Sequence, residues 1–361
     1  MKNVVVILTG GGARGAFQVG AWYRILKDGI NFGNGMETIG IPKAVFGVSA
    51  GALNGAMIAM GKNQEIISLW NEIAGNPNEV YTSEFLKMEN SKVKLDLQQL
   101  AKYILSDVGA FQKIGLLFEK SRNKTLAKVI EKIKTIKGLA DNTPLYEKVK
   151  QLIQLKDFKS DVFQAGFVSL TDGRYHSINH TDFSSDQALQ NAVLASSTIP
   201  LVWSPVERVN TKSFELSHLI DGGIRNVTPL GDAVRYVKNS EQDEFYFVII
   251  SCHTNGLKTM GEPPNILNII ERSIFDIAMN EIRDTDTSEF LRINDLVRQA
   301  KQKGIDLLDK NGQKLKSFKV KIIQPLRELS TGLDFSRTAV MDSFAHGFEV
   351  AKSVITSPHW D

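Results

Sequence analysis

Two short apolar runs near the start of the chain are each followed by a segment with helical periodicity. The runs Val4–Leu8 and Lys43–Val48 are almost continuously apolar, as strands are when both faces of their sheet are covered. The hydrophobic spacing behind them predicts helices at about 16–27 and 50–60. We therefore expect the carboxyl ends of two neighbouring parallel strands to lie side by side, each leading into a helix.

The rest of the chain continues to alternate between strand and helix patterns. Asp172-Gly173 is a two-residue hairpin signal, and Ser184 or Ser185 can cap a helix that Pro200 ends. Further strands are predicted at 162–170, at 174–179, in the residues before Asp221, at 245–251 and at 318–323, and further helices at 185–197, 265–303 and 336–355. This order predicts an α/β fold whose sheet has helices on both faces.

Charge is unevenly distributed along the chain. Residues 87–159 hold 16 Lys and Arg against 8 Asp and Glu, a net charge of +8, whereas the remainder has a net charge of −5. Apolar residues in this insert recur at helical spacing, from Leu97 to Val108 and from Leu126 to Ile133. Thr143 is predicted to be the N-cap of a third helix, with Pro144 at its first position. The insert is interpreted either as a solvated helical subdomain or as a cationic surface that meets anionic lipid.

Composition narrows the class of protein. The chain has 361 residues, 42% of them hydrophobic, and a net charge of only +3, which gives no argument for nucleic-acid binding. A single cysteine, Cys252, excludes an internal disulfide framework and a cysteine-cluster metal site. The first apolar run is too short for a signal peptide, and the charge-free stretch Ala44–Met60 contains polar residues and glycines that argue against a transmembrane helix. We expect a cytoplasmic protein with at most peripheral membrane contact.

A glycine-rich turn, Gly10–Gly15, follows the first strand. Such a turn brings backbone N–H groups close to a ligand at the start of a helix. It fits a dinucleotide-binding turn, but that interpretation needs an acidic residue at the end of a second strand, and only Glu37 lies near the required distance. The same donors can instead stabilise an oxyanion, and a purely structural turn is the third possibility.

Ser49 lies between the second strand and its helix, within Gly47-Val48-Ser49-Ala50-Gly51. This Gly-x-Ser-x-Gly pattern between a strand and a helix is typical of a nucleophile elbow, in which a sharp turn exposes the serine hydroxyl. Ser49 is therefore the candidate nucleophile.

The base is less obvious from the residues alone. Of six histidines, His253 follows a predicted strand and stands where a general base could lie, although an ordinary hydrogen-bonding role is the default for each of them. Asp221-Gly222-Gly223 also follows an apolar strand, and the glycines permit close approach of another loop; a plain turn is the alternative.

Taken together, these motifs resemble the patatin-like phospholipase family in its bacterial form. The resemblance rests on Gly10–Gly15 with Arg14, on Ser49 in its elbow, on Asp221-Gly222-Gly223, and on the small-residue run Ala195–Pro200 with Trp203 and Pro205 beyond it. It covers roughly residues 3–230. Two departures are Thr9, where many members have Asp, and the insert, which falls in the family's variable region.

The resemblance implies a three-layer α/β/α fold with a mainly parallel central sheet and a helical insertion. The chain is then expected to be a single domain over 1–361, with a catalytic core at about 3–230, the basic insert at 87–159 and a C-terminal α/β extension at 240–361.

It also implies a Ser49–Asp221 dyad acting through an acyl-enzyme on a lipid ester. Gly47 and Gly51 would shape the elbow, Gly222 and Gly223 would support the aspartate, and Arg14 would either hold the glycine turn or attract a phosphate. The implied oxyanion hole is the segment Gly10, Gly11, Gly12, Ala13, Arg14 and Gly15, with N–H groups of Gly11, Gly12 and Ala13 as donors.

On this basis we expect a phospholipid or other acyl-lipid substrate, contact with a membrane surface, no cofactor, no metal and no nucleic-acid partner. Replacing Ser49 or Asp221 should abolish activity, whereas His253→Ala and His346→Ala should leave most of it. The alternatives are a generic serine esterase or lipase acting on neutral esters, a nucleotide-binding protein that uses the glycine turn, and a catalytically silent lipid-binding scaffold.

Overall fold

The computed structural model describes residues 2–89, 92–106, 119–240, 244–254 and 272–361, together with Gly256, Thr259 and Ile269. Within these residues the chain forms an eight-stranded sheet in the order β12-β11-β1-β4-β7-β10-β9, with β8 also paired to β7. Neighbouring strands from β12 to β7 run parallel, while β8 and β10 run antiparallel to β7, and β9 runs antiparallel to β10. The strands are β1 (Val4–Leu8), β4 (Ala44–Val48), β7 (Val162–Ser169), β8 (Tyr175–Asn179), β9 (Val206–Asn210), β10 (Glu215–Asp221), β11 (Tyr246–Ile250) and β12 (Lys319–Ile323).

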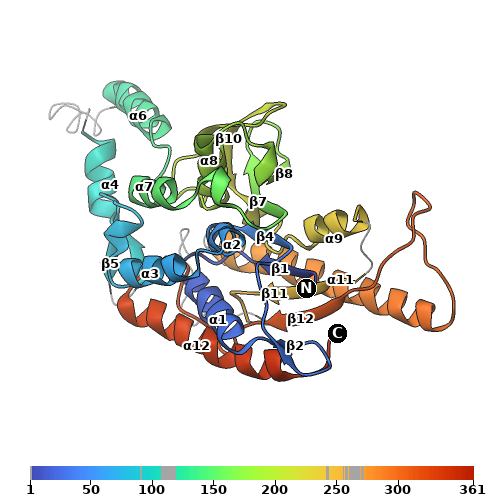
Figure 1. Ribbon diagram of the computed structural model, residues 1–361. Helices are drawn as coiled ribbons and strands as arrows, with labels where there is room; N and C mark the ends of the chain where they lie inside the picture. Colours follow the sequence, from blue (N-terminus) through green and yellow to red (C-terminus); the bar gives the residue numbers. More distant parts are fainter. Residues whose placement is uncertain are drawn as a thin grey trace.

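Helices cover both faces of this sheet, which confirms the predicted three-layer α/β/α arrangement (Figure 1). Side chains of β1 alternate between two apolar clusters, with Val6 and Leu8 in one and Val5 and Ile7 in the other. The first cluster is covered by α1 (Gly15–Asp28), α2 (Ala50–Met60), α3 (Asn63–Ile73), α7 (Thr143–Leu152), α8 (Asp186–Ser196) and α12 (Arg337–Thr356). The second is covered by α9 (Leu230–Lys238) and α11 (Met279–Gln302).

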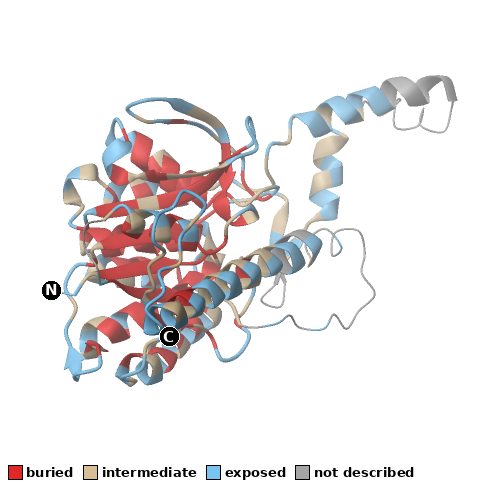
Figure 2. Ribbon diagram, turned by 90° about the vertical axis from the view of Figure 1, so that its right-hand side faces the viewer, coloured by how far each residue is buried: buried red, intermediate tan, exposed pale blue. Residues whose placement is uncertain are grey.

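Part of the basic insert projects from this body as an arm, which we define as residues 86–137. Its described elements are β5 (Leu86–Glu89), β6 (Lys92–Leu95), α4 (Leu97–Ile104) and α6 (Glu119–Lys134). Figures 1 and 2 show α4 and α6 standing away from the sheet, with largely exposed surfaces. The chain leaves and re-enters the body at one point, since Thr82 and Asp141 exchange backbone hydrogen bonds of 2.9 and 2.8 Å.

Three details of the insert differ from the sequence analysis. The insert opens with the β5–β6 hairpin where only helices were expected. Its last helix, α7, buries Leu145 and Val149 in the body and so does not belong to the arm. That helix is preceded by Asn142 at the N-cap position, because Thr143 already lies within it and bonds Asp141. The prediction at Val108 lies outside the described residues.

The C-terminal third of the chain completes the sheet. β11 lies between β1 and β12, and α12 packs along α1. The two helix backbones meet at glycines, since a Cβ at Gly20 would lie 1.9 Å from the carbonyl oxygen of Phe344, and one at Gly347 would lie 2.0 Å from that of Phe17. The remaining short strands, β2 (Ile30–Asn31) and β3 (Met36–Glu37), form a small hairpin after α1.

Candidate active site

Ser49 stands at the sharp turn between β4 and α2. Its backbone has a φ of 57° and a ψ of −130°, a conformation that residues other than glycine rarely adopt and that recurs at reactive sites. Helix α2 starts directly against the end of β1, because a Cβ at Gly51 would lie 2.4 Å from the carbonyl oxygen of Leu8. A Cβ at Gly47 would in turn lie 2.2 Å from the carbonyl oxygen of Gly51. The turn thus has the backbone of a nucleophile elbow and room only for glycine at these two positions.

Asp221 ends β10, and a single strand, β7, separates it from the elbow. On one side β7 places Gly166 beside Val48, and on the other it places Phe167 beside Asp221. The two candidate residues therefore lie across the same point of β7, where the Ser49 side chain is near enough to favour the charged form of Asp221. Gly222 permits this approach, since a Cβ there would lie 2.4 Å from the carbonyl oxygen of Gly166.

The carboxyl group of Asp221 is almost removed from water. The residue is 2% exposed, and its Oδ1 accepts a 2.8 Å hydrogen bond from the N–H of Gly223. Burial raises the pKa of Asp221 from 3.8 to about 7, although the hydrogen bonds from Ser49 and Gly223 act in the opposite direction. A carboxylate with this pKa is a far better base at neutral pH than a solvated one.

The end of α8 contacts the backbone of both candidate residues. The Ser196 hydroxyl accepts the N–H of Ser49 at 2.9 Å, and the Ser197 hydroxyl donates to the carbonyl of Ser49 at 3.2 Å. The carbonyl of Thr198 accepts the N–H of Asp221 at 2.8 Å. From the sequence, the small-residue run Ala195–Pro200 contributed only to the resemblance to the family. Hydroxyl side chains at a helix end are the signal that could have indicated these contacts.

The glycine turn lies beside the elbow. A Cβ at Gly10 would lie 3.9 Å from the Oγ of Ser49, and Gly12 has a φ of 56°, in the left-handed region that favours glycine. Four of the six N–H groups of Gly10–Gly15 have acceptors inside the protein. They belong to Gly10, Ala13, Arg14 and Gly15, and their acceptors are the carbonyls of Val227, Gly332, Gly11 and Gly12, in that order.

The N–H groups of Gly11 and Gly12 have no hydrogen-bond acceptor in the part of the chain that the structure describes. They are therefore the donors of the predicted oxyanion hole that remain open to a ligand. Ala13, which was expected to be a third donor, gives its N–H to Gly332 at 2.7 Å.

His253, which follows β11, contacts the glycine turn. Its Nε2 is 2.9 Å from the carbonyl oxygen of Gly10, and its Nδ1 is 3.5 Å from Arg14. Burial, then Arg14 and Arg283, lower the pKa of His253 to about 3, so the ring is neutral. A carbonyl only accepts and a guanidinium only donates, which places the proton of this ring on Nε2.

The structure gives less support to a nucleotide-binding site, a metal site or a membrane-spanning helix. Glu37 is exposed on β3, away from the end of β4 where a ribose-binding carboxylate would be needed. Thr9, at the position of the family's Asp, accepts the N–H of Cys252 at 2.9 Å. Across the described ranges, no three His, Cys, Asp or Glu side chains gather as metal ligands, and no helix is both long and apolar enough to cross a bilayer.

Comparison with known proteins identifies the family to which this chain belongs. Residues 6–234 match the family model described as patatin-like phospholipase. Among solved structures, VipD from Legionella pneumophila is similar at 15% identity and a TM-score of 0.39, over 98% of this chain and 67% of that one, and a search of curated proteins found no match. Because the family model spans most of the chain and includes both glycine turns and Asp221, this protein belongs to the patatin-like phospholipase family.

Proposed function

We propose that this protein is a lipid acyl hydrolase that cleaves carboxylic ester bonds of glycerophospholipids through a Ser49–Asp221 dyad. The observation that carries the proposal is that β7 holds the strained turn of Ser49 on one side and, at the neighbouring position on the other side, a buried Asp221 whose pKa is raised to about 7. A nucleophile paired with a base of near-neutral pKa is the arrangement that serine hydrolysis requires.

In the first half of the reaction, the Oγ of Ser49 attacks the ester carbonyl carbon, and its proton passes to the carboxylate of Asp221. The N–H groups of Gly11 and Gly12 would stabilise the negative charge that develops on the carbonyl oxygen. The tetrahedral intermediate then breaks its bond to the leaving alcohol, which takes the proton from Asp221. The acyl group remains on Ser49.

In the second half, water replaces the alcohol. Asp221 accepts a proton as the water oxygen attacks the acyl carbon, and it returns that proton to Oγ as the bond to Ser49 breaks. The fatty acid is released and the dyad is restored. No step needs a third residue to accept or donate a proton. This agrees with the position of His253, whose ring contacts the carbonyl of Gly10 in the glycine turn.

The arm supports a phospholipid in a membrane as the substrate. Its residues include 12 Lys and Arg against 5 Asp and Glu, and Leu126, Ile130 and Ile133 lie exposed at the spacing of one helix face. An apolar stripe beside basic residues is typical of helices that bind an anionic lipid surface. The proposed membrane contact is therefore the side of the arm that carries this stripe.

The test compares phospholipid vesicles, triglyceride emulsion and a p-nitrophenyl butyrate solution as substrates. We expect phospholipid to be cleaved, Ser49→Ala and Asp221→Asn to lose activity on every substrate, and a fluorophosphonate probe to label Ser49. The exposed Asp182 provides a matched control, and Asp182→Asn should retain activity. Hydrolysis by Ser49→Ala would overturn the dyad, and a preference for triglyceride would favour a neutral-ester lipase.

A further inference from the structure

Two segments outside the region that matches the family model contact different ends of the glycine turn. The match ends at residue 234. His253 follows β11 and contacts Gly10, while residues 330–336 precede α12 and contact Ala13 and Arg14. Neither segment contains a group that the proposed reaction uses.

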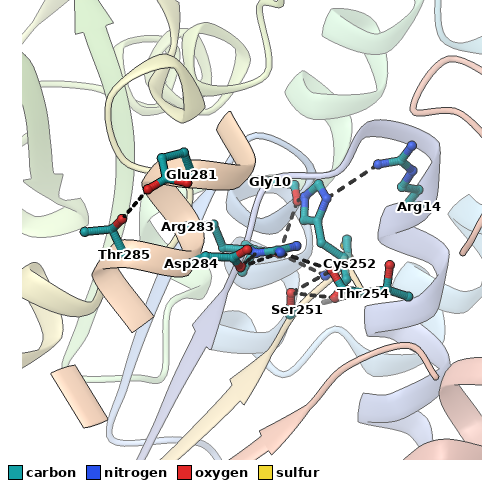
Figure 3. A network of polar contacts seen from close by, with 11 residues as sticks. Gly10, Arg14, Ser251, Cys252, Thr254, Glu281, Arg283, Asp284 and Thr285 are labelled. Carbon is teal, nitrogen blue, oxygen red and sulfur yellow. Dashed lines mark hydrogen bonds and ion pairs between the residues drawn. The ribbon is translucent and has the colours of Figure 1, made fainter. Parts of the chain in front are cut away.

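The first of these contacts fixes the start of the turn. The Nε2 of His253 donates to the carbonyl of Gly10, so it holds the peptide that also carries the N–H of Gly11. Arg14 faces the other ring nitrogen, and Arg283 donates to the carbonyl of Thr254 at 3.0 Å. Figure 3 shows Gly10 and Arg14 of the glycine turn, Thr254 after β11 and Arg283 of α11 converging in this network.

The second contact fixes the far side of the turn. The carbonyl of Gly332 accepts the N–H of Ala13 at 2.7 Å, and the carbonyl of Ser330 accepts the Nε of Arg14 at 2.7 Å. The fit is close, since a Cβ at Gly12 would lie 2.2 Å from the oxygen of Gly332.

Hydrogen bonds to a buried carboxylate fix the conformation of residues 330–336. Asp334 is 2% exposed, and its carboxylate accepts hydrogen bonds from the Ser330 hydroxyl and from the N–H of Ser336. Ser336 then caps α12. The carbonyls of Ser330 and Gly332 are thus held by a turn fixed to the C-terminal helix.

We propose that His253 and the turn Ser330–Gly332 are positioning groups that hold the N–H donors of Gly11 and Gly12 in place for the oxyanion. The inference rests on the proposed function. Donors stabilise a transition state best when their orientation is fixed before the reaction. The N–H groups of Gly11 and Gly12, which have no acceptor among the described residues, lie between these two contacts in the sequence. His253 acts through the peptide of Gly10 and does not itself exchange a proton with substrate.

The first experiment separates this role from general-base catalysis with p-nitrophenyl butyrate. We expect His253→Ala to lower kcat about tenfold, less than the ~10²–10³ that loss of an oxyanion donor itself costs, with KM changed less than about twofold. This revises the expectation from the sequence that the variant keeps most activity. His253→Gln has an amide that can still donate to Gly10, and it should restore most of kcat.

The pH profile supplies the readout that distinguishes the two roles. Because His253 is neutral, His253→Gln should retain the acid limb of the wild-type profile. If His253 were a general base, His253→Gln would not restore kcat and its pH profile would lack the acid limb. The matched control is His180→Ala, which removes a buried histidine at the amino end of β7 and should leave kcat within about twofold.

The second experiment tests the other contact. A Cβ at Gly332 would lie 3.3 Å from the oxygen of Gly11 and would press on the peptide that carries the N–H of Gly12. We expect Gly332→Ala to lower kcat about three- to tenfold with KM little changed, as for loss of an interaction made only in the transition state. Gly231→Ala is the control, because nothing lies within 4 Å of a Cβ there.

The outcomes are distinguishable. An unchanged kcat in both His253→Ala and Gly332→Ala, beside an inactive Ser49→Ala, would overturn this inference and leave the proposed function intact. Activity in Ser49→Ala would overturn both. If His253→Ala does not fold, His253→Gln and His253→Leu, which differ in their ability to donate to Gly10, make the same comparison.

Discussion

The carboxyl group of Asp221 has two properties that oppose each other. The loss of water that raises its pKa to about 7 makes it an effective base, and it also makes its negative charge costly to the folded protein. The sequence allowed Ser49 and Asp221 to be proposed as candidates because each lies in a short pattern with glycines. It did not reveal this pKa, because burial depends on β7, β10 and α8 packing together. The contacts of Ser196 with Ser49, and of Gly332 with Ala13, join residues more than a hundred positions apart and leave no local signal.

The pKa of Asp221 leads to a first prediction, on the pH dependence of the rate. A general base must be ionised, so kcat/KM should fall below about pH 7, approaching tenfold for each pH unit. Hydrolysis of p-nitrophenyl butyrate between pH 5 and 9 measures this. An acid limb centred near ~4, where a solvated carboxyl titrates, would contradict the environment described for Asp221.

The second prediction concerns stability. The folded pKa of Asp221 lies above its unfolded value, so the folded state binds more protons between about pH 4 and 7 and loses stability as pH rises through that range. Asp221→Asn has no charge to bury. It should raise the free energy of unfolding at pH 8 by up to about 4 kcal/mol, at ~1.4 kcal/mol per pKa unit, and should have no effect near pH 4.

Urea unfolding at the two pH values provides the measurement. Ser49→Ala is the control, because it removes activity but keeps the carboxyl group, and its loss of stability with rising pH should be at least as large as that of the wild type, since Ser49 lowers the pKa of Asp221. An Asp221→Asn protein that is equally destabilised at both pH values would contradict the prediction.

At the scale of elements, hydrophobic periodicity predicted the strands and helices of the body well. Runs such as Val4–Leu8 are long enough and apolar enough to allow one interpretation. The β5–β6 hairpin was missed, although Leu86, Met88, Val93 and Leu95 alternate with charged residues, because the stronger helical pattern that follows dominated the interpretation of the insert. The packing of α12 on α1 was also beyond prediction, since it depends on two glycines 327 positions apart.

The third prediction tests that packing. Gly347→Ala would place a Cβ 2.0 Å from the carbonyl oxygen of Phe17 and force α1 and α12 apart. We expect the free energy of unfolding to fall by about 1–3 kcal/mol, even though Ala favours a helix over Gly by ~1 kcal/mol. Urea unfolding measures the change. Gly231→Ala, with open space around its Cβ, should be neutral or slightly stabilising, and equal effects of the two substitutions would rule out close packing as the cause.

At the scale of the whole molecule, the arm is attached to the body at one point, whereas the C-terminal third forms part of the body. The arm leaves and returns through the hydrogen-bonded pair Thr82 and Asp141, so its removal need not disturb the sheet. The C-terminal third contributes β11 and β12 to the sheet and α12 to its cover, so it is inseparable from the fold.

The fourth prediction follows from the first of these relations. A chain in which the arm, residues 86–137, is replaced by a short Gly/Ser linker should fold and keep its hydrolysis of p-nitrophenyl butyrate within about twofold. It should lose binding to anionic vesicles, where each basic residue contributes ~1 kcal/mol. Vesicle sedimentation with and without anionic lipid measures the binding. If the shortened chain bound anionic vesicles as well as the full chain, the membrane-binding surface would lie on the body and not on the arm.

The position of β11 between β1 and β12 also has a consequence for biosynthesis. A growing polypeptide on the ribosome acquires Ser49 and Asp221 well before β11, His253 and α12 have been made. Until then β1 lacks a neighbour and the glycine turn lacks both of its supports. If the proposed function is correct, we expect a nascent chain that still lacks β11, His253 and α12 not to hydrolyse lipids.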